Sequence, residues 1–523
     1  MTTQYSLGRD GEPPLDVAII GAGVAGVYTG WSLRTRASAL AGNDGPPHVA
    51  IFEQGERVGG RLFTATPPHA PHLKCELGGM RYIDTQDLVV DLIAELGLAS
   101  KPFMVGDEHN LNYLRGERFT LADLHAGSER IPYALAPDER GKAPPELLAK
   151  ALEAFLADGA ALTEAEKLQR EREMTVDGQP VTKVPAIDVI RSALSAGGYD
   201  FLIEGMGYTC ILDPAISAVN LIHTDLRGGT RRTLIDGMQA LPLTLAQRFE
   251  GAGGQIALRH SLRTVEATGD AYRLHLDTPD GPIDVTARHV VLALPAQALR
   301  DLAPDSLPLT DAGFRRDLDS VVPVPAAKLY FGFESPWWEA AGLKDGRSDT
   351  DLPIRQCLYF GVESEQPDGD PTNTSALLVA SYSDGDATGY WEQRVCVPPY
   401  YATPAGFPEG LAVSAAVVED VRKQLEQVHG IPVPQPEWAA FQDWTPAPFG
   451  GGWHYWRVGH RSVDVVPRMR HPLPDERIYI CGEAFSSHQA WILGALSSAE
   501  QMLQQQFGAP YPRWLRPDAD LGA

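Results

Sequence analysis

Three glycines near the beginning of the chain, Gly21, Gly23 and Gly26, have the spacing of a phosphate-binding turn. The apolar residues 15–20 precede them and predict a short strand, and a helix-compatible stretch follows as far as Arg36. In such a unit the first glycine permits the tight turn, the second lets the backbone approach a pyrophosphate, and the third lets helix and strand pack closely. The helix N-terminus then faces the phosphate charge. The segment therefore predicts a dinucleotide site.

A carboxylate follows at the end of the next predicted strand. Residues 48–52 form a second apolar run that leads to Glu53, which is 53 − 26 = 27 residues after Gly26. The usual gap is ~20 residues, and the polar loop at 41–47 accounts for the excess. An acid here can bind both hydroxyls of an adenosine ribose and would repel a 2′-phosphate. The alternative is an ordinary strand–helix–strand unit whose final Glu is solvated.

More glycines lie beside charged residues further along the chain. The members of this group are Gly60 with Arg61, Gly78 and Gly79 with Met80 and Arg81, and Gly482 with Glu483 after a predicted strand at 477–481. The first of these segments permits a second backbone approach to a diphosphate, which a nicotinamide domain does not need. The sequence has no second complete GxGxxG pattern, so a nicotinamide site is not predicted.

The composition narrows the class of ligand. The chain has 523 residues, 44% of them hydrophobic, and its formal net charge is −24. This charge would repel nucleic acid and anionic lipid, so a small molecule is the expected partner. The five cysteines are scattered and no Cys/His cluster has zinc-ligand spacing, so neither a disulfide framework nor a metal site is predicted. The sequence shows no signal-peptide pattern or membrane-spanning run, which makes a cytoplasmic location the default expectation.

Taken in order, the motifs resemble those of the flavin-dependent amine oxidases, and within that family the L-amino acid oxidases. The resemblance covers most of the chain and rests on GAGVAG at 21–26, ERVGGRLFT at 56–64, ELGGMRY at 76–82, IDGMQALP at 235–242, HVVLALP at 289–295, Lys328, and YICGE at 479–483. It implies an α/β fold with a Rossmann-like FAD-binding domain, a mixed-sheet substrate domain and a helical insertion.

The resemblance and the local patterns together predict three domains. The FAD-binding domain combines residues 10–72, 235–320 and 460–510, and the substrate domain combines 73–139 and 321–459. Residues 140–234 form the helical domain, because residues 142–172 carry apolar side chains at three- and four-residue spacings. In the family this insertion shapes a substrate entrance and often a subunit contact, so a homodimer is one expected state beside a monomer.

The resemblance assigns two residues to the carboxylate of an amino acid substrate. A guanidinium can grip a carboxylate through two parallel hydrogen bonds, and Arg81 matches the position of that arginine in the L-amino acid oxidases. Tyr382 matches a tyrosine whose hydroxyl binds the same group. The alternatives are a structural ion pair between Arg81 and an acid such as Glu76, and a packed sheet aromatic at Tyr382.

Three more residues are predicted at the reacting end of the site by the same resemblance. Lys328 matches the lysine that holds a water against flavin N5, where it assists the oxygen reaction or imine hydrolysis, although a lone lysine in a strand is usually a solvated edge residue. Trp491 matches an aromatic wall of the substrate site. Ala490 stands where many relatives have glycine, which leaves open whether its carbonyl contacts the substrate ammonium.

The remaining residues are expected to hold the cofactor. Glu483 would hydrogen-bond the ribityl chain, or it could simply start the terminal helix. The full predicted cofactor set comprises Gly21, Gly23, Gly26, Glu53, Gly60, Arg61, Gly78, Gly79, Met80, Arg81, Val265, Trp453, Gly482, Glu483, Trp491 and Ile492. Monoamine oxidases carry a flavin-linking cysteine in the loop comparable to that of Trp453. No cysteine lies between Cys396 and Cys481, so the FAD is expected to be noncovalent.

These features predict an L-amino acid oxidase. Hydride transfer from Cα to the flavin would give an imino acid that hydrolyses to a 2-oxo acid and ammonia, and dioxygen would become hydrogen peroxide. Aromatic residues near the site favour large apolar or aromatic side chains within a broad range of substrates. The alternatives are an amino acid 2-monooxygenase that forms an amide, an amine or polyamine oxidase, and a non-catalytic flavoprotein.

Overall fold

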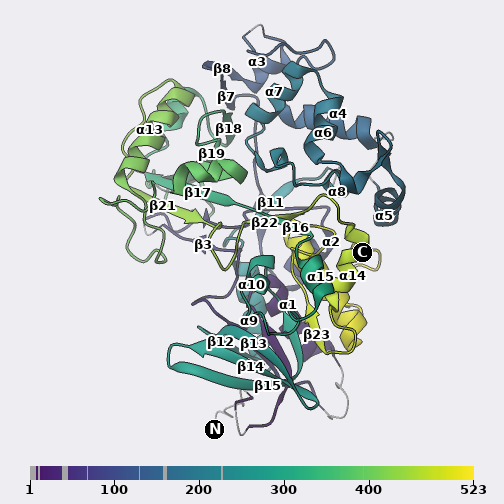
Figure 1. Ribbon diagram of the computed structural model, residues 1–523. Helices are drawn as coiled ribbons and strands as arrows, with labels where there is room; N and C mark the ends of the chain where they lie inside the picture. The colour runs from purple at the N-terminus through teal and green to yellow at the C-terminus, as the bar shows by residue number, and fades with distance from the viewer. Residues whose placement is uncertain are drawn as a thin grey trace.

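The computed structural model describes residues 8–9, 12–37, 45–67, 69–128, 130–156, 162–224, 228–392 and 394–522. The described strands include two seven-stranded sheets. Strands β12 to β15 of the first sheet lie at the bottom of Figure 1, the second sheet lies at the upper left, and helices α4 to α8 lie at the upper right. The predicted α/β class is therefore confirmed.

The first sheet carries the predicted glycine turn. Its order is β12-β2-β1-β15-β14-β13, with β23 paired to β15. The strands are β1 (Leu15–Ile20), β2 (Val49–Glu53), β12 (Gln255–Leu258), β13 (Ser261–Thr268), β14 (Ala271–Thr278), β15 (Gly281–Leu292) and β23 (Ile478–Ile480). All six residues of β1 are buried between parallel neighbours, which explains its continuous apolar run. Residues 41–44 of the predicted polar loop lie outside the described residues.

Three helices cover this sheet near the turn. Helix α1 (Val24–Arg36) packs against both α9 (Ala240–Gly251) and α15 (Ile492–Phe507), and ten successive residues of α1 are buried. Helix α15 confirms the predicted terminal helix. Because α1 is enclosed on several sides, its sequence is apolar or small almost all round rather than amphipathic. The packing fixes the direction in which the N-terminus of α1 points.

The second sheet is mixed and carries Lys328 and Tyr382. Its order is β21-β17-β20-β19-β18-β7-β8. The strands are β7 (Leu111–Leu114), β8 (Glu117–Thr120), β17 (Ala326–Phe333), β18 (Gly346–Thr350), β19 (Gln356–Val362), β20 (Ala376–Asp384) and β21 (Trp438–Asp443). On β17, Leu329 and Phe331 face a core cluster shared with α13 (Ala415–His429), whereas Tyr330 belongs to the cluster on the opposite face. Lys328 shares the face of Tyr330 and pairs directly with Tyr382 across the sheet.

The predicted helical segment contains helices and three short strands. Its helices are α4 (Pro144–Leu156), α5 (Glu164–Glu173), α6 (Ala186–Ala193), α7 (Ala196–Gly205) and α8 (Val219–His223). Strand β11 (Arg231–Leu234) lies within predicted segment 140–234 but pairs with β5 (Tyr82–Ile83) and β6 (Ser100–Pro102). Local helical periodicity gave no signal for this long-range pairing. The residue boundaries of the three domains stay a prediction.

Smaller elements complete the described fold. They are β3 (Thr64–Ala65), β4 (Cys75–Glu76), β9 (Thr175–Val176), β10 (Gln179–Pro180), β16 (Val321–Val324), β22 (Trp453–Trp456), α2 (Asp87–Glu95), α3 (Leu121–His125), α10 (Ala296–Arg300), α11 (Ala312–Leu318), α12 (Gly389–Glu392) and α14 (Ser462–Arg470). Strand β22 pairs with β16 and carries the aromatic segment after the glycines at 450–452. Among the described residues, every helix is too short or too polar to cross a membrane.

Candidate active site

One cavity of about 510 Å³ brings together segments from all parts of the sequence. Its volume lies in the usual range of ligand and cofactor sites, ~300–1,000 Å³. The predicted residues that line it are Gly21, Gly23, Glu53, Gly60, Arg61, Gly78, Gly79, Met80, Arg81, Lys328, Tyr382, Trp453, Gly482, Glu483, Ala490, Trp491 and Ile492. Gly26 and Val265 are the two predicted residues that the cavity lining does not include.

The glycine turn forms one end of this cavity. Gly21 has a φ of 101°, and Gly23 is the N-cap of α1 with open space where a side chain would begin. A Cβ atom on Gly26 would lie 1.9 Å from the carbonyl oxygen of Gly21, so this position excludes every larger residue. Gly26 therefore acts through packing, as its place in the pattern predicts, and does not line the cavity. Gly59 donates its N–H to the carbonyl of Ala22 at 2.9 Å, which brings the second glycine segment to the turn.

Glu53 has a structural role at this end. Its carboxylate accepts the N–H of Ala22 at 2.8 Å and the N–H of Gly55 at 2.8 Å. Both bonds hold the backbone around the turn. Each oxygen keeps further lone pairs, so the same carboxylate can also accept ribose hydroxyls. Glu53 is partly exposed at the cavity, as a ribose ligand requires, and its ribose contact stays a prediction.

Val265 does not line the cavity, so its assignment to the cofactor set stays a prediction. Its side chain is fully buried, its N–H donates to Ser306 Oγ at 2.9 Å, and its carbonyl accepts the N–H of Leu307 at 2.9 Å. Leu262 and His260 line the cavity instead. The pairing of β13 with β14 shifts between Leu262 and Thr264, and such an irregularity changes which residues face a ligand.

A closed network of polar groups surrounds Glu483. Its carboxylate accepts Arg61 Nη2 at 2.9 Å, the backbone N–H and Nδ1 of His454 at 2.8 and 2.9 Å, and the N–H of Ala490 at 2.9 Å. Burial opposes ionisation of Glu483, but Arg61, His454 and the Ala490 N–H outweigh it and lower its pKa to about 2. Arg61 also donates to the carbonyl of Gly452 at 2.9 Å. The network therefore ties three loops to one ionised carboxylate.

The position of α15 removes one alternative for Glu483. The helix begins at Ile492 with Trp491 as its N-cap, and its first turn has no acidic residue. Glu483 consequently does not start the terminal helix.

His454 is fully buried, and burial lowers its pKa, so a neutral imidazole bonded to Glu483 is expected. This is the packed, hydrogen-bonded histidine that is common among aromatic residues.

Another part of the cavity lining contains the cation Arg81, which has no anionic partner among the described residues. Arg81 Nη2 donates to the hydroxyl of Tyr208 at 3.2 Å, and its guanidinium lies 5.5 Å from the ring centre of Phe103. Among the residues that the structure describes, no carboxylate forms an ion pair with Arg81. Glu76 instead accepts the N–H of Met238 at 2.8 Å and the Thr64 hydroxyl at 2.9 Å. The alternative of an Arg81–Glu76 ion pair is therefore wrong.

Tyr382 lies beside Arg81 and Tyr208 in this part of the lining. Its ring meets that of Tyr208 edge to face, with 5.6 Å between the ring centres. Burial, with the neighbouring Tyr208 and Asp384, raises the pKa of Tyr382 well above its ordinary value. The hydroxyl thus stays protonated and can donate a hydrogen bond. Tyr208 lies just after helix α7, and the sequence analysis did not identify it because its contact with Arg81 is formed only in the fold.

Lys328 is a buried residue in the interior of the second sheet. Its side chain is 4% exposed, and Nζ donates to the carbonyls of Glu76 at 2.8 Å and Gly78 at 2.5 Å. The solvated edge lysine considered from the sequence is therefore wrong, because β17 lies between β20 and β21. Burial lowers the pKa of Lys328 and raises that of Glu76, since both charged forms are poorly solvated.

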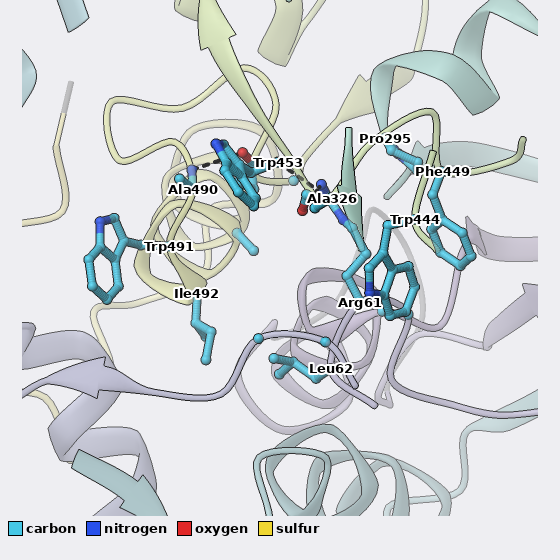
Figure 2. A pocket seen from close by; sticks show the side chains of 18 of the residues that line it. Arg61, Leu62, Pro295, Ala326, Trp444, Phe449, Trp453, Ala490, Trp491 and Ile492 are labelled. Carbon is cyan, nitrogen blue, oxygen red and sulfur yellow. Dashed lines mark hydrogen bonds and ion pairs between the residues drawn. The ribbon is translucent and has the colours of Figure 1, made fainter. Parts of the chain in front are cut away.

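Aromatic side chains line other parts of the cavity. Figure 2 shows Trp453 and Trp491 near Ala490, with Trp444 and Phe449 across the cavity beside Pro295. Trp444 was not predicted, although its Nε1 donates to the carbonyl of Leu77 at 2.9 Å. The helical segment adds further lining residues that were also missed: Leu148, Leu152, Met206, Asn220, Leu221 and Thr224.

Ala490 adopts a backbone conformation typical of glycine. Its φ is 67°, in the left-handed region that costs non-glycine residues of order 1–3 kcal/mol. Its N–H is directed to Glu483, and it immediately precedes Trp491 at the cavity. The conformation would suit glycine, although this chain carries alanine.

These residues fit the flavin dinucleotide expected from the sequence. A helix N-terminus and glycine backbone face the cavity where phosphates would lie, the Glu53 carboxylate lines it at the end of β2, and aromatic side chains border space for a flat ring system. Arg81, which has no carboxylate partner among the described residues, and the protonated Tyr382 also line the cavity. They can bind an anionic group on a second, smaller molecule.

Comparisons with known proteins agree with this arrangement. Residues 35–502 match the sequence model of the flavin containing amine oxidoreductases. Aplysianin-A of Aplysia kurodai and achacin of Lissachatina fulica are each 28% identical, over 94% of this chain and 90% and 93% of those proteins. An L-amino-acid oxidase of Mus musculus is 25% identical over 72% of this chain and 54% of that protein. A structure of wild-type putrescine oxidase bound to putrescine is similar with a TM-score of 0.65 at 18% identity, over 95% of this chain and 98% of that one.

Proposed function

The chain belongs to the flavin-containing amine oxidoreductase family and uses FAD, and we propose that it catalyses the oxidative deamination of L-amino acids. The overall reaction converts an L-amino acid, water and dioxygen to a 2-oxo acid, ammonia and hydrogen peroxide. Bound FAD supplies the acceptor for the hydride that leaves the substrate Cα. The chain's own residues bind, orient and shield the reactants.

The observation that carries the proposal is the guanidinium of Arg81, for which the described residues provide no carboxylate. A partly buried cation with no carboxylate partner among the described residues is costly unless a ligand supplies the anion. The α-carboxylate of an amino acid meets this need and can accept two parallel hydrogen bonds. The Tyr382 hydroxyl, kept protonated by burial, is a second donor at the same place.

The cofactor would be held by the glycine turn, Glu53 and the network around Glu483. Gly23 and Gly60 expose backbone toward the cavity, and Arg61 is fixed by Glu483 and by the Gly452 carbonyl. We propose noncovalent binding, because the buried Cys210 at the cavity has a strongly raised pKa and is not a nucleophilic thiolate. Denaturation should release intact FAD, and colour retained by the precipitated chain would refute this.

Lys328 is proposed to position a water molecule at the reacting end. Its Nζ has two carbonyl acceptors on the loop that also carries Gly79 and Arg81, so a third N–H direction is available for a water. Burial makes loss of its proton easier than in solution, which suits a group that assists proton movement near neutral pH. Trp453 and Trp491 exclude bulk solvent and favour large apolar or aromatic substrate side chains.

The experiment that tests the function compares substrates that differ only in the carboxylate. Peroxide release should be faster from L-ornithine than from putrescine, and from L-phenylalanine than from phenethylamine. Each amine is the decarboxylated form of the amino acid, so the side chain is matched within the pair. A preference for the amines would refute the proposal. An amide rather than a 2-oxo acid as product would assign the chain to the monooxygenases.

An amine oxidase is the second candidate. The similarity to putrescine oxidase extends over 95% of this chain and supports the shared fold. An identity of 18% does not establish that the two proteins share a substrate. A diamine has no group that needs Arg81, and its second ammonium would be repelled by that guanidinium. The L-amino acid assignment is therefore the better supported one.

A further inference from the structure

A second polar site lies behind the segment that carries Ala490 and Trp491. It consists of Glu164 at the beginning of α5, His488 in the loop before α15, and Asp520 in the segment after that helix. One ligand-type atom from each residue lies within 4.8 Å of the others. None of the three lines the flavin cavity, so the cluster is separate from the site described above.

Two buried atoms in this cluster have no hydrogen-bond partner in the described structure. They are Nε2 of His488 and Oε2 of Glu164. His488 is only 9% exposed, and its Nε2 lies 3.1 Å from the point where a side chain would begin on Gly522. The Gly522 N–H donates to Asp520 Oδ1 at 2.9 Å, so the imidazole nitrogen is directed at the turn that contains Asp520. Buried polar atoms without a partner are rare in native proteins and indicate a missing ligand or water.

The cluster joins two carboxylates to one imidazole, and one lysine contacts it. Lys167 donates to Oε1 of Glu164 at 2.6 Å and offsets one carboxylate. The neighbouring Glu171 accepts His223 Nε2 at 3.0 Å and is also bonded to Ser462, so its oxygens are occupied. A divalent cation would give Oε2 of Glu164 and Nε2 of His488 the partner that they lack in the described structure.

We propose that Glu164, His488 and Asp520 bind a divalent transition-metal ion, with Zn²⁺ as the representative ion. One imidazole nitrogen and two carboxylates are ligand types of Zn²⁺, which accepts mixed nitrogen and oxygen donors. Ca²⁺ and Mg²⁺ prefer all-oxygen sites, so the histidine selects against them. No local motif indicated this site, because its ligands come from segments far apart in the chain.

The ion would act as a structural tie between three segments. Only Gln489 separates His488 from Ala490, whose N–H bonds Glu483, and Trp491 follows at the cavity. Fixing His488 to α5 and to the segment at Asp520 thus restricts the position of the wall beside the flavin. The ion is not in contact with the flavin cavity and takes no part in the chemistry there.

Metal content and binding test the proposal without reference to catalysis. The holoprotein is treated with a chelator, dialysed, and titrated with Zn²⁺ and separately with Ca²⁺ in a calorimeter. We expect one Zn²⁺ per chain at saturation, a higher melting temperature with Zn²⁺, and no saturable response to Ca²⁺. Absence of saturable Zn²⁺ binding would overturn the proposal.

Substitutions then locate the ion. Glu164→Gln, His488→Asn and Asp520→Asn should each weaken Zn²⁺ binding by at least about tenfold, since even residues that only support metal ligands have effects of ~10–100-fold. Asp518→Asn is the control, because Asp518 is exposed on the same segment and lies outside the cluster. Far-ultraviolet circular dichroism checks that each variant folds. If His488→Asn does not fold, the isosteric variants Glu164→Gln and Asp520→Asn still test the site. Equal affinity in Glu164→Gln, Asp520→Asn and the wild type would overturn the site.

Discussion

Two groups of charged residues face the same cavity, and they differ in whether their charges are balanced within the chain. Arg61 and the backbone N–H groups of His454 and Ala490 donate hydrogen bonds to the ionised carboxylate of Glu483, and these bonds hold three loops together. Around Arg81, the structure provides a tyrosine hydroxyl and an aromatic ring but no described carboxylate. A group whose charges are compensated within the chain stabilises the fold, whereas a group with an uncompensated charge can bind a ligand of opposite charge. Substitutions in the first group should therefore affect stability, and those in the second should affect substrate binding.

The largest effect on stability is expected from Arg61→Met. It leaves the Glu483 carboxylate, which is 7% exposed, without its guanidinium partner. Removing one member of a buried pair costs ~3–5 kcal/mol, and FAD retention should fall as well. Denaturant unfolding measures the loss. The control is Arg259→Met, which breaks an exposed 2.7 Å ion pair with Glu56 and should cost ~0–1 kcal/mol. Equal losses in both variants would contradict the distinction.

Acid should weaken the same group in a defined pH range. The pKa of Glu483 is lowered from 4.5 to about 2 in the folded protein, a difference that corresponds to ~3 kcal/mol. A depressed folded pKa stabilises the protein above the unfolded pKa, and this contribution is lost as the pH falls through the folded value. The gap in unfolding free energy between wild type and Glu483→Gln should therefore shrink between about pH 4.5 and about pH 2. A gap that stays constant across that range would show that the Glu483 carboxylate is not the cause.

Arg81→Met should change catalysis with little effect on stability. Removing one partner of a hydrogen-bonded charge pair costs ~2–5 kcal/mol, so kcat/KM for L-amino acids should fall at least about 30-fold. Flavin content and melting temperature should stay close to those of the wild type. Tyr208→Phe removes only one bond to Arg81 and should lower kcat/KM less, by ~0.5–1.5 kcal/mol. Near wild-type kcat/KM in a flavin-loaded Arg81→Met enzyme would refute the carboxylate role.

Lys328→Met should separate the two halves of the reaction. Reaction with dioxygen or release of the imine should slow by about tenfold, or ~1.4 kcal/mol, while anaerobic reduction by substrate changes little. Stopped-flow absorbance resolves the two steps. Tyr330→Phe is the matched control, since Tyr330 donates to the same Glu76 carbonyl at 2.8 Å but carries no ammonium. A collapse of anaerobic reduction with normal reoxidation would assign Lys328 to the substrate step instead.

The smallest expected effect is a gain in stability from Ala490→Gly. Glycine adopts the observed φ of 67° without strain, so the free energy of unfolding should rise by up to ~1 kcal/mol. Ala499→Gly is the control with the opposite sign, because Ala499 lies inside α15 and glycine costs ~1 kcal/mol there. Denaturant midpoints measure both changes. A loss of stability in Ala490→Gly would show that the alanine methyl group contributes packing that outweighs the strain.

Local patterns were sufficient to predict the elements that the site uses. The strand, glycine turn and helix at 15–36 were predicted because each depends on neighbours within a few residues, and the steric exclusion at Gly26 confirms the packing part of that pattern. The sequence run around Lys328 likewise predicted a strand. The sequence could not show that Leu262 lines the cavity and Val265 does not, because a register shift within β13 is not visible in the alternation of residue types.

The sequence by itself determined the α/β class, the turn for the dinucleotide and the residue types available for chemistry. Only the tertiary structure decided which charges meet. It placed Tyr208 against Arg81, put Lys328 directly across from Tyr382, and left Arg81 without a carboxylate partner among the described residues. The reason is physical: turns and helices depend on short-range sterics and hydrogen bonds, whereas burial and charge balance depend on segments hundreds of residues apart that share one low-dielectric cavity.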